Sequence, residues 1–238
     1  MTSARGAESL PPIESHALLV DRVVQLLRQA ILTGDLPPGA RLSVPDLARQ
    51  LNVSRTPVRD ALYALERAGL AVTRPRRGAV VFGGGRDELT QLFELREPLD
   101  GMAARLAAER MSEDERQELR NALRRHSKAI QERDTERHIE LDLEFHRRVR
   151  DGAGNPRLAE ELARLGEQIV LVMRAVSSAP GAMGRAVLRE HKAILDAVVT
   201  GQPDAAEHAA RAHVRSVLRF VLSTALTSER PAAERVQR

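Results

Sequence analysis

Residues 54–81 read SRTPVRDALYALERAGLAVTRPRRGAVV, and this stretch decides the fold of the N-terminal third of the chain. The apolar residues of its first half fall at helical spacing: Val58, Ala61, Leu62 and Leu65. This spacing predicts a helix with one buried face, opened by Ser54 as the N-cap and closed by Gly69. Two short β-favouring runs follow around the segment Arg-Pro-Arg-Arg-Gly, which predicts a hairpin with a basic loop.

Two more helices are predicted upstream of this stretch. Apolar residues recur at helical spacing from Ala17 to Thr33, and Ser43 is a suitable N-cap for a short helix that ends near Leu51. The prolines and glycine of the segment DLPPGARLS predict a turn between them. Residues 1–16 have no sustained period, so we expect a flexible arm there. The predicted order over residues 17–82 is that of a winged helix-turn-helix, in which a helix enters the major groove of DNA.

Six residues of this region are predicted to contact DNA: Ser54, Arg55, Thr56, Arg59, Arg77 and Gly78. Arg55 and Arg59 lie four residues apart, hence on one helix face, and arginine can make a bidentate contact to guanine. Small hydroxyl groups at a helix N-terminus suit phosphate oxygens. A glycine at the hairpin tip permits close approach to the backbone of the nucleic acid.

The charge distribution also favours DNA binding by the N-terminal third of the chain. Residues 1–85 hold eleven arginines against seven acidic residues, whereas residues 86–238 hold twenty-six basic and twenty-six acidic residues, so the net charge of +4 lies in the first third. Phosphate contacts supply most non-specific DNA affinity. A basic module that binds a polyanion, joined to a neutral module, explains this asymmetry, although chance scatter in an arginine-rich chain remains an alternative.

Composition excludes several other classes of protein. With 238 residues the chain suggests two domains, and 42% hydrophobic residues suit a globular protein that buries a core. The absence of cysteine excludes disulfides and thiolate metal sites. No apolar run is long enough for a membrane span, and the first residues lack the apolar core of a secretion signal, so we expect a cytoplasmic protein with no membrane partner.

The second part of the chain is predicted to be helical throughout. Gly83, Gly84 and Gly85 mark a linker over residues 83–87, and an all-helical domain for ligand binding and dimerisation is expected over residues 88–227, followed by a polar tail over residues 228–238. Helical periods cover residues 87–110, 112–132, 134–151, 155–178, 184–200 and 203–226. The predicted fold class is therefore mainly α, with the winged helix-turn-helix followed by an antiparallel bundle of about six helices.

Four residues of the bundle could bind a metal ion. Asp142 and His146 are four residues apart on one helix, while His191 and His213 lie on two later helices joined by a turn. Three imidazoles and one carboxylate suit a divalent ion, zinc first, with nickel or manganese as alternatives. Spacing alone leaves ordinary core and surface histidines as an alternative. The remaining histidines are predicted to be incidental: His16 in the arm, and His126, His138 and His208 on solvated faces.

The sequence of residues 18–82 resembles the winged helix-turn-helix of GntR-family regulators, above all in SRTPVRDAL, ERAGL and RRGAVV. Residues 89–224 are similar to the all-helical FCD domain of the FadR-type subfamily, in its metal-binding branch. This second resemblance rests on LREPLDGMAARLAA, LDLEFHRRV, GNPRL and REHKAILDAVVTGQPDAAEHAARAHV.

The resemblance implies roles for individual residues. Arg55, Thr56, Arg59 and Gly78 match positions that meet DNA, and Asp142, His146, His191 and His213 match the four metal ligands. Arg96 matches a position that often faces the effector, which the resemblance implies is a small organic acid. Pro45, Asp100 and Gly101 depart from the usual pattern, and Gly101 is expected to weaken its helix.

The function predicted from the sequence is that of a ligand-responsive transcription regulator, not an enzyme. The resemblance implies a homodimer that binds a palindromic operator, more often as a repressor, and senses a small carboxylic acid at the metal. One alternative is a regulator whose C-terminal domain only dimerises, with a structural metal or none. A metallohydrolase is the second alternative, but the sequence has no HExxH motif and no obvious general base near the proposed ligands.

Overall fold

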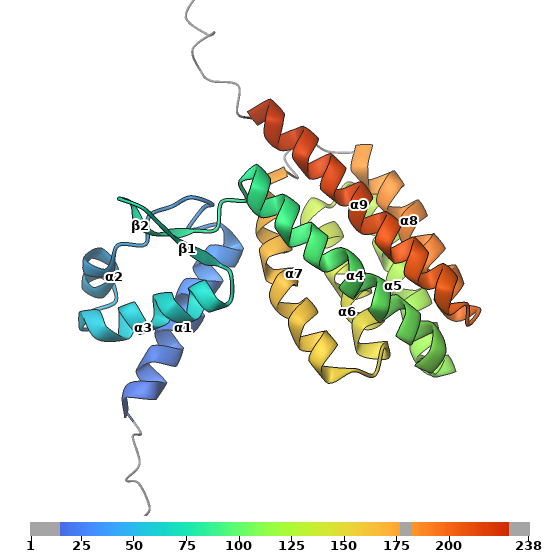
Figure 1. The fold of residues 1–238 in the computed structure, drawn as a ribbon, viewed down its shortest axis with the longest axis horizontal. Helices are drawn as coiled ribbons and strands as arrows, with labels where there is room; N and C mark the ends of the chain where they lie inside the picture. Colours follow the sequence, from blue (N-terminus) through green and yellow to red (C-terminus); the bar gives the residue numbers. More distant parts are fainter. Residues whose placement is uncertain (1–14, 177–181, 229–238) are drawn as a thin grey trace, which may run out of the picture. The chain divides into compact units, whose positions relative to one another are not determined.

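The stretch from residue 54 to residue 81 forms the predicted helix and hairpin: α3 (Arg55–Arg67), β1 (Ala71–Arg74) and β2 (Gly78–Val81). The two strands are antiparallel, with Ala71 opposite Val81 and Arg74 opposite Gly78. The structure is a computed structural model that describes residues 15–176 and 182–228. It divides into two compact units between Val81 and Phe82, and each is considered by itself (Figure 1).

The first unit has one small core. Helix α1 (Ser15–Thr33) packs against α3, and α2 (Val44–Gln50) covers the other end of α3. The core residues come from all parts of the unit: Val23, Leu27, Ile31, Leu47, Val58, Ala61, Leu62, Leu65, Leu70 and Val80. The apolar spacing therefore marked the buried face of α3 correctly, but on α1 the apolar residues Leu19 and Leu26, which belong to the same helical pattern, are exposed.

Two local details of this unit differ from the sequence analysis. Ser43 and Ser54 occupy the N-cap positions of α2 and α3, but neither side chain accepts a capping hydrogen bond. The segment predicted as a plain turn also pairs with the hairpin, because Arg41 forms a bridge with Val80 and the Leu42 N–H donates to the Ala79 carbonyl at 2.8 Å. This pairing depends on a tertiary contact that local sequence does not reveal.

The second unit is a helical bundle, which confirms the predicted fold class (Figure 1). Its described helices are α4 (Arg86–Arg110), α5 (Glu113–Glu132), α6 (Thr135–Gly152), α7 (Pro156–Val176), α8 (Ala182–Val199) and α9 (Pro203–Ser228). Helix α4 runs beside α9 over most of its length and also contacts α6, α7 and α8. None of the described helices is long and apolar enough to cross a membrane.

Several predicted features lie outside the described residues. These are residues 1–14 of the predicted arm, the breakers Pro180 and Gly181, and residues 229–238 of the predicted tail. The end of the predicted arm is helical, since α1 begins at Ser15.

Gly101 allows α4 and α9 to approach closely. The helix continues through Gly101 without interruption, so the expected weakening does not break it. A Cβ added at Gly101 would lie 2.7 Å from Cγ of Arg211 on α9, which is too close for any larger residue without movement. The glycine therefore serves the contact between these helices.

We predict that Leu119→Ala will destabilise the bundle strongly. Leu119 on α5 is completely buried in the main core cluster, which also contains Phe145 and Ile194. Removal of a buried leucine side chain should lower the free energy of unfolding by about 2–5 kcal/mol. Urea unfolding of the full-length protein measures this loss. Lys128→Ala on the exposed side of the same helix is the control, and an equal loss in both variants would contradict the assigned core.

Candidate DNA-binding surface and metal centre

The N-terminal turns of α3 present the polar residues predicted to read DNA. Ser54, Arg55, Thr56 and Arg59 are all exposed, whereas the intervening Val58 is completely buried. The helix is thus fixed by its apolar face, and its other face is available for base edges and phosphates.

The tip of the hairpin supplies the second group of predicted residues. Arg76, Arg77 and Gly78 are exposed. Arg76 and Gly78 have positive φ angles of 63° and 74°, which close the tight turn between β1 and β2. Glycine adopts this conformation without strain, and the space around Gly78 is open, since a Cβ there would meet no atom within 4 Å. The two groups give the first unit a basic surface with the composition of a DNA-binding face.

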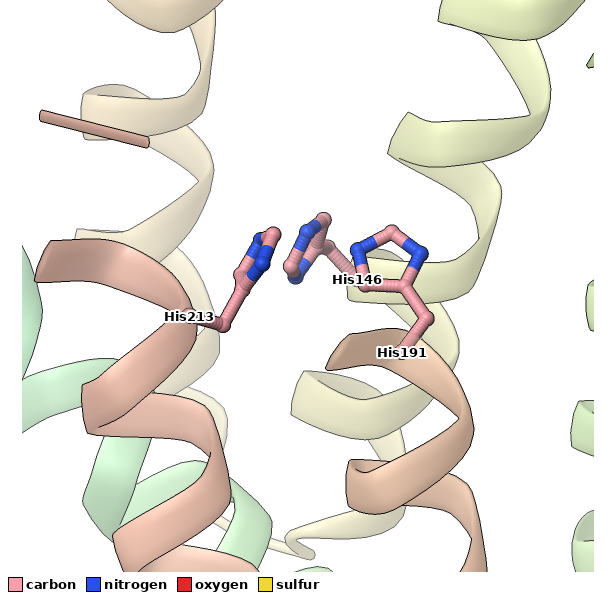
Figure 2. Close-up of side chains that lie close together, drawn as sticks. All are labelled: His146, His191 and His213. Atoms are coloured by element: carbon pink, nitrogen blue, oxygen red, sulfur yellow. The ribbon is translucent and has the colours of Figure 1, made fainter. Parts of the chain in front are cut away.

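The second unit brings together the four residues predicted to bind a metal ion. His146 on α6, His191 on α8 and His213 on α9 direct their rings toward one another (Figure 2). One ring nitrogen from each lies within 4.8 Å of the others. The carboxylate of Asp142 lies 3.7 Å from Nε2 of His191 and 4.0 Å from Nε2 of His146. Three helices that are distant in sequence therefore converge on one polar cluster.

The burial of this cluster favours the forms that bind a metal ion. Burial is the main cause that lowers the pKa of His146 to about 4, and it lowers the pKa of His191 well below the usual value. Burial opposes ionisation of Asp142, but the surrounding histidines, His146 first, hold its pKa below the usual value. At neutral pH His146 and His191 are therefore neutral and Asp142 is ionised, as metal ligation requires.

His191 shows that the cluster fits a metal ion. Its side chain is completely buried, and neither ring nitrogen has a hydrogen-bond partner among the described residues. An unsatisfied buried polar group costs about 1–3 kcal/mol. A divalent ion held by Asp142, His146, His191 and His213 would give one of these nitrogens a partner, so the residues present fit the group that the sequence predicts.

Glu190 is a supporting residue that the sequence analysis missed. Its carboxylate accepts a hydrogen bond from Nδ1 of His213 at 2.9 Å, which leaves Nε2 of His213 with a free lone pair. Burial acts against ionisation of Glu190, but the hydrogen bond from His213 holds its pKa below the usual value. A carboxylate that orients a ligand histidine in this way is typical of metal sites. Glu190 directly precedes His191, yet nothing local indicates its contact with α9.

His126 contradicts the prediction of a solvated surface histidine. It is completely buried, and its Nε2 lies 2.7 Å from Nδ1 of His138, which is half-buried. His126, Asp142 and His191 form a second group of possible ligand atoms within 4.8 Å of one another. The sequence contained a signal for this, since His126 continues the apolar spacing of Leu119, Ala122 and Leu123 on α5. His208, by contrast, is exposed as predicted.

A pocket opens beside the cluster of Asp142, His146 and His213. It contains about 640 Å³ of empty space, counting the part open to solvent. Its polar lining consists of Asp142, His146 and His213 together with His138, Arg96, Asp100 and Arg150. Apolar side chains complete the lining: Leu143, Leu162, Ile169, Met173, Val187 and Val217. A concave, mostly apolar pocket with a few charged groups is the usual form of a small-molecule site.

Arg96 lies in this pocket but is already paired. Its Nη2 atom lies 2.8 Å from the Asp100 carboxylate, and the two side chains are 10% and 13% exposed. The Nε atom of Arg96 is buried without a hydrogen-bond partner among the described residues. Arg96 therefore retains one donor for a ligand, while Asp100 balances its charge.

Comparison with known proteins gives matches for both units. The model of bacterial regulatory proteins of the gntR family matches residues 19–81, and the FCD domain model matches residues 91–216. The chain is 30% identical over 204 residues to the probable D-xylose utilization operon transcriptional repressor of Paenarthrobacter nicotinovorans, covering 86% of this chain and 89% of that protein. It is also 30% identical over 219 residues to the HTH-type transcriptional repressor NanR of Enterobacter sp. (strain 638), covering 84% of each.

One solved structure shows the same fold. McbR/YncC of E. coli matches with a TM-score of 0.70 at 24% sequence identity, over 87% of this chain and 98% of that chain.

We predict that His191→Ala will abolish tight binding of zinc. The variant removes a buried ligand at the centre of the cluster, so the zinc affinity should fall by about 10-fold or more. Titration of chelator-treated protein with Zn²⁺ in the presence of a competing indicator measures this affinity. His208→Ala, which removes an exposed histidine from α9, should leave the affinity unchanged. Equal zinc binding by the His191 variant and the unmodified protein would refute the proposed ligand set.

Proposed function

The chain belongs to the GntR family of bacterial regulatory proteins and carries an FCD domain, and from this premise we propose that it is a repressor whose second unit senses a small organic acid at a bound divalent metal ion. It is a DNA-binding transcription regulator, and its relatives are regulators, not enzymes. Repression is proposed because the two relatives described above are both named as repressors.

The first unit is proposed to bind an operator through the polar face of α3 and the hairpin tip. Arg55 and Arg59 are the candidates for base contacts, because both are exposed on the N-terminal turns of α3. Ser54, Thr56, Arg77 and Gly78 are proposed to meet the phosphate backbone. We propose that two copies of the chain bind a palindrome, since a symmetric dimer presents two such helices to two half-sites about one helical turn apart.

The observation that best supports acid sensing is that the histidine cluster and the pocket share residues. Asp142, His146 and His213 belong to both, so a small molecule in the pocket would touch the metal ligands. When bound, a divalent ion supplies a Lewis-acidic position that attracts an anionic oxygen. Zinc is the proposed ion because three imidazoles and a carboxylate form a donor set that suits it, with nickel or manganese as the alternatives.

The other charged side chains of the pocket are proposed to orient the acid. The unpartnered Nε–H of Arg96 is available to donate to a carboxylate oxygen, and the apolar lining would hold the carbon chain of the ligand.

We place the protein in the cytoplasm, because a regulator of this family acts on the bacterial chromosome.

Arg59→Ala is expected to weaken specific DNA binding. An operator is first selected from random duplexes with the unmodified protein, and the affinity is then measured by fluorescence anisotropy at fixed salt. Loss of a bidentate base contact should cost about 1–3 kcal/mol on the selected site and much less on unrelated DNA. Arg67→Ala, at the opposite end of α3, is the matched control. If both variants bind the operator as the unmodified protein does, Arg59 is not a base contact.

The sensing proposal predicts a ligand that stabilises only the metal-loaded protein. Melting temperatures are measured with zinc bound and after chelation, against a panel of monocarboxylic, dicarboxylic, hydroxy and sugar acids. At about 100 times its dissociation constant, a ligand that binds the folded state adds about 2.7 kcal/mol of stability, which is a shift of several degrees. His191→Ala should lose this shift and His208→Ala should keep it.

Two other outcomes would replace the sensing proposal. If chelation lowers the melting temperature but no acid raises it, the metal is structural and the second unit serves dimerisation. If an acid stabilises the protein equally with and without metal, the acid binds elsewhere and the metal is not part of its site.

A further inference from the structure

We propose that Arg150 is the residue that selects the ligand, and that the ligand is a short dicarboxylic acid with one carboxylate at the metal cluster and the other at Arg150. This inference rests on the proposed function and specifies its ligand class.

Helix α6 presents one polar residue per turn to the pocket. His138, Asp142, His146 and Arg150 follow one another at intervals of four residues, and all four line the pocket. Residues four apart lie on the same face of a helix, one turn along. Arg150 is therefore one turn, or about 6 Å of helix rise, beyond the metal-ligand position His146. A ligand held at the metal cluster reaches Arg150 through a chain of a few carbon atoms.

Among the described residues, no carboxylate forms a hydrogen bond with the guanidinium of Arg150. Its ion pair among the described residues is with Asp151, where Nε and Oδ1 are 3.8 Å apart, longer than a hydrogen bond. Asp151 is instead engaged by Arg147, whose Nη1 donates to it at 3.0 Å. Burial is the main cause that lowers the pKa of Arg150, which is the effect expected of a cation removed from water without full compensation.

Arg96 differs from Arg150 in this respect. Asp100 pairs with Arg96 at 2.8 Å inside the same pocket, so the charge of Arg96 is balanced within the protein. Displacing Asp100 would leave a largely buried carboxylate unpaired, which is costly. Arg150 is 20% exposed, and so it can meet an incoming anion without breaking a short ion pair. It is thus the cation of this pocket that is available to a second carboxylate.

The charges of the pocket match a dianion. Two positive and two negative side chains line it: Arg96, Arg150, Asp100 and Asp142. These charges balance one another when the histidines are neutral, so a bound divalent ion would leave an excess of two positive charges. A dicarboxylate removes this excess, whereas a monocarboxylate leaves half of it in a poorly solvated space. Arg150 also extends across the pocket toward α7, where its Nη1 lies 4.0 Å from the Cβ position of Gly166.

The test compares paired acids on the full-length, zinc-loaded protein. Malonate, succinate, glutarate and adipate are each measured beside the monocarboxylate of equal carbon number, and the dissociation constants come from isothermal titration calorimetry. The unmodified protein should bind at least one of these dicarboxylates about 10-fold or more tightly than its partner monocarboxylate, because a charge-assisted hydrogen bond is worth about that factor.

Arg150→Gln should lower the affinity for the preferred dicarboxylate by about 10- to 100-fold and should change the affinity for the monocarboxylate little. The preference for the dicarboxylate is then lost. Arg150→Lys should restore part of the affinity, since it keeps the charge but loses the planar fork. Arg137→Gln, which alters an exposed arginine on the same helix that pairs with Glu140, should leave both constants unchanged. A zinc titration of each variant distinguishes loss of the acid contact from loss of the metal.

The outcomes separate this inference from the proposed function. If the unmodified protein binds monocarboxylates as tightly as dicarboxylates, or if Arg150→Gln and Arg150→Lys both keep the preference, the role of Arg150 is refuted while acid sensing stands. If no acid of either series binds the zinc-loaded protein, the dicarboxylate inference fails, whereas the acid-sensing proposal fails only if the hydroxy and sugar acids do not bind either.

Discussion

The burial of His191 is the constraint on which the second unit depends. Both ring nitrogens are buried and have no hydrogen-bond partner among the described residues. The ring stacks on that of Phe145, a residue of the main core, with 4.4 Å between the ring centroids. An apolar residue would fill this place without any cost of unsatisfied polar atoms. The arrangement becomes favourable when a metal ion supplies the missing partner, because its binding free energy then adds to the stability of the fold. The ion would also tie α6, α8 and α9 together at one point.

This constraint links the sensing site to the rest of the bundle. Helix α9 carries His213 and runs along α4, and Gly101 lets the two helices approach closely. Helix α4 carries Arg96 and begins only a few residues after strand β2. The proposed sensing site therefore includes a residue of the helix that follows the first unit in the chain. The ligand can alter DNA binding only if it has a higher affinity for one arrangement of the two units than for another, because coupling between two sites requires such a difference.

Much of this organisation could be predicted from the sequence, because it depends on local periodicity. The spacing of Val58, Leu62 and Leu65 fixed α3 and left its polar face outward, and the glycine and proline breakers separated the later helices. The cluster of Asp142, His146, His191 and His213 required the resemblance, since periodicity does not determine which helices meet. Contacts across helices were missed for that reason, as with Glu190 and His213. His126 is a different case, because its place on the apolar face of α5 was visible and was misinterpreted as a charged surface.

The groups around the three imidazoles suit the proposed binding of a ligand better than hydrolysis of a substrate. A metal centre that hydrolyses a substrate needs a base free to take a proton from water. Glu190 is a further carboxylate beside the cluster, and its hydrogen bond to His213 commits it to orienting that ring. Asp142 lies within the ligand set, and Asp100 is paired with Arg96. The other described groups of the pocket are His138, which contacts His126, the two arginines Arg96 and Arg150, and apolar side chains. The arginines would stabilise a bound anion in its ground state. Such uniform stabilisation holds a ligand without accelerating its reaction, which is what a sensor requires.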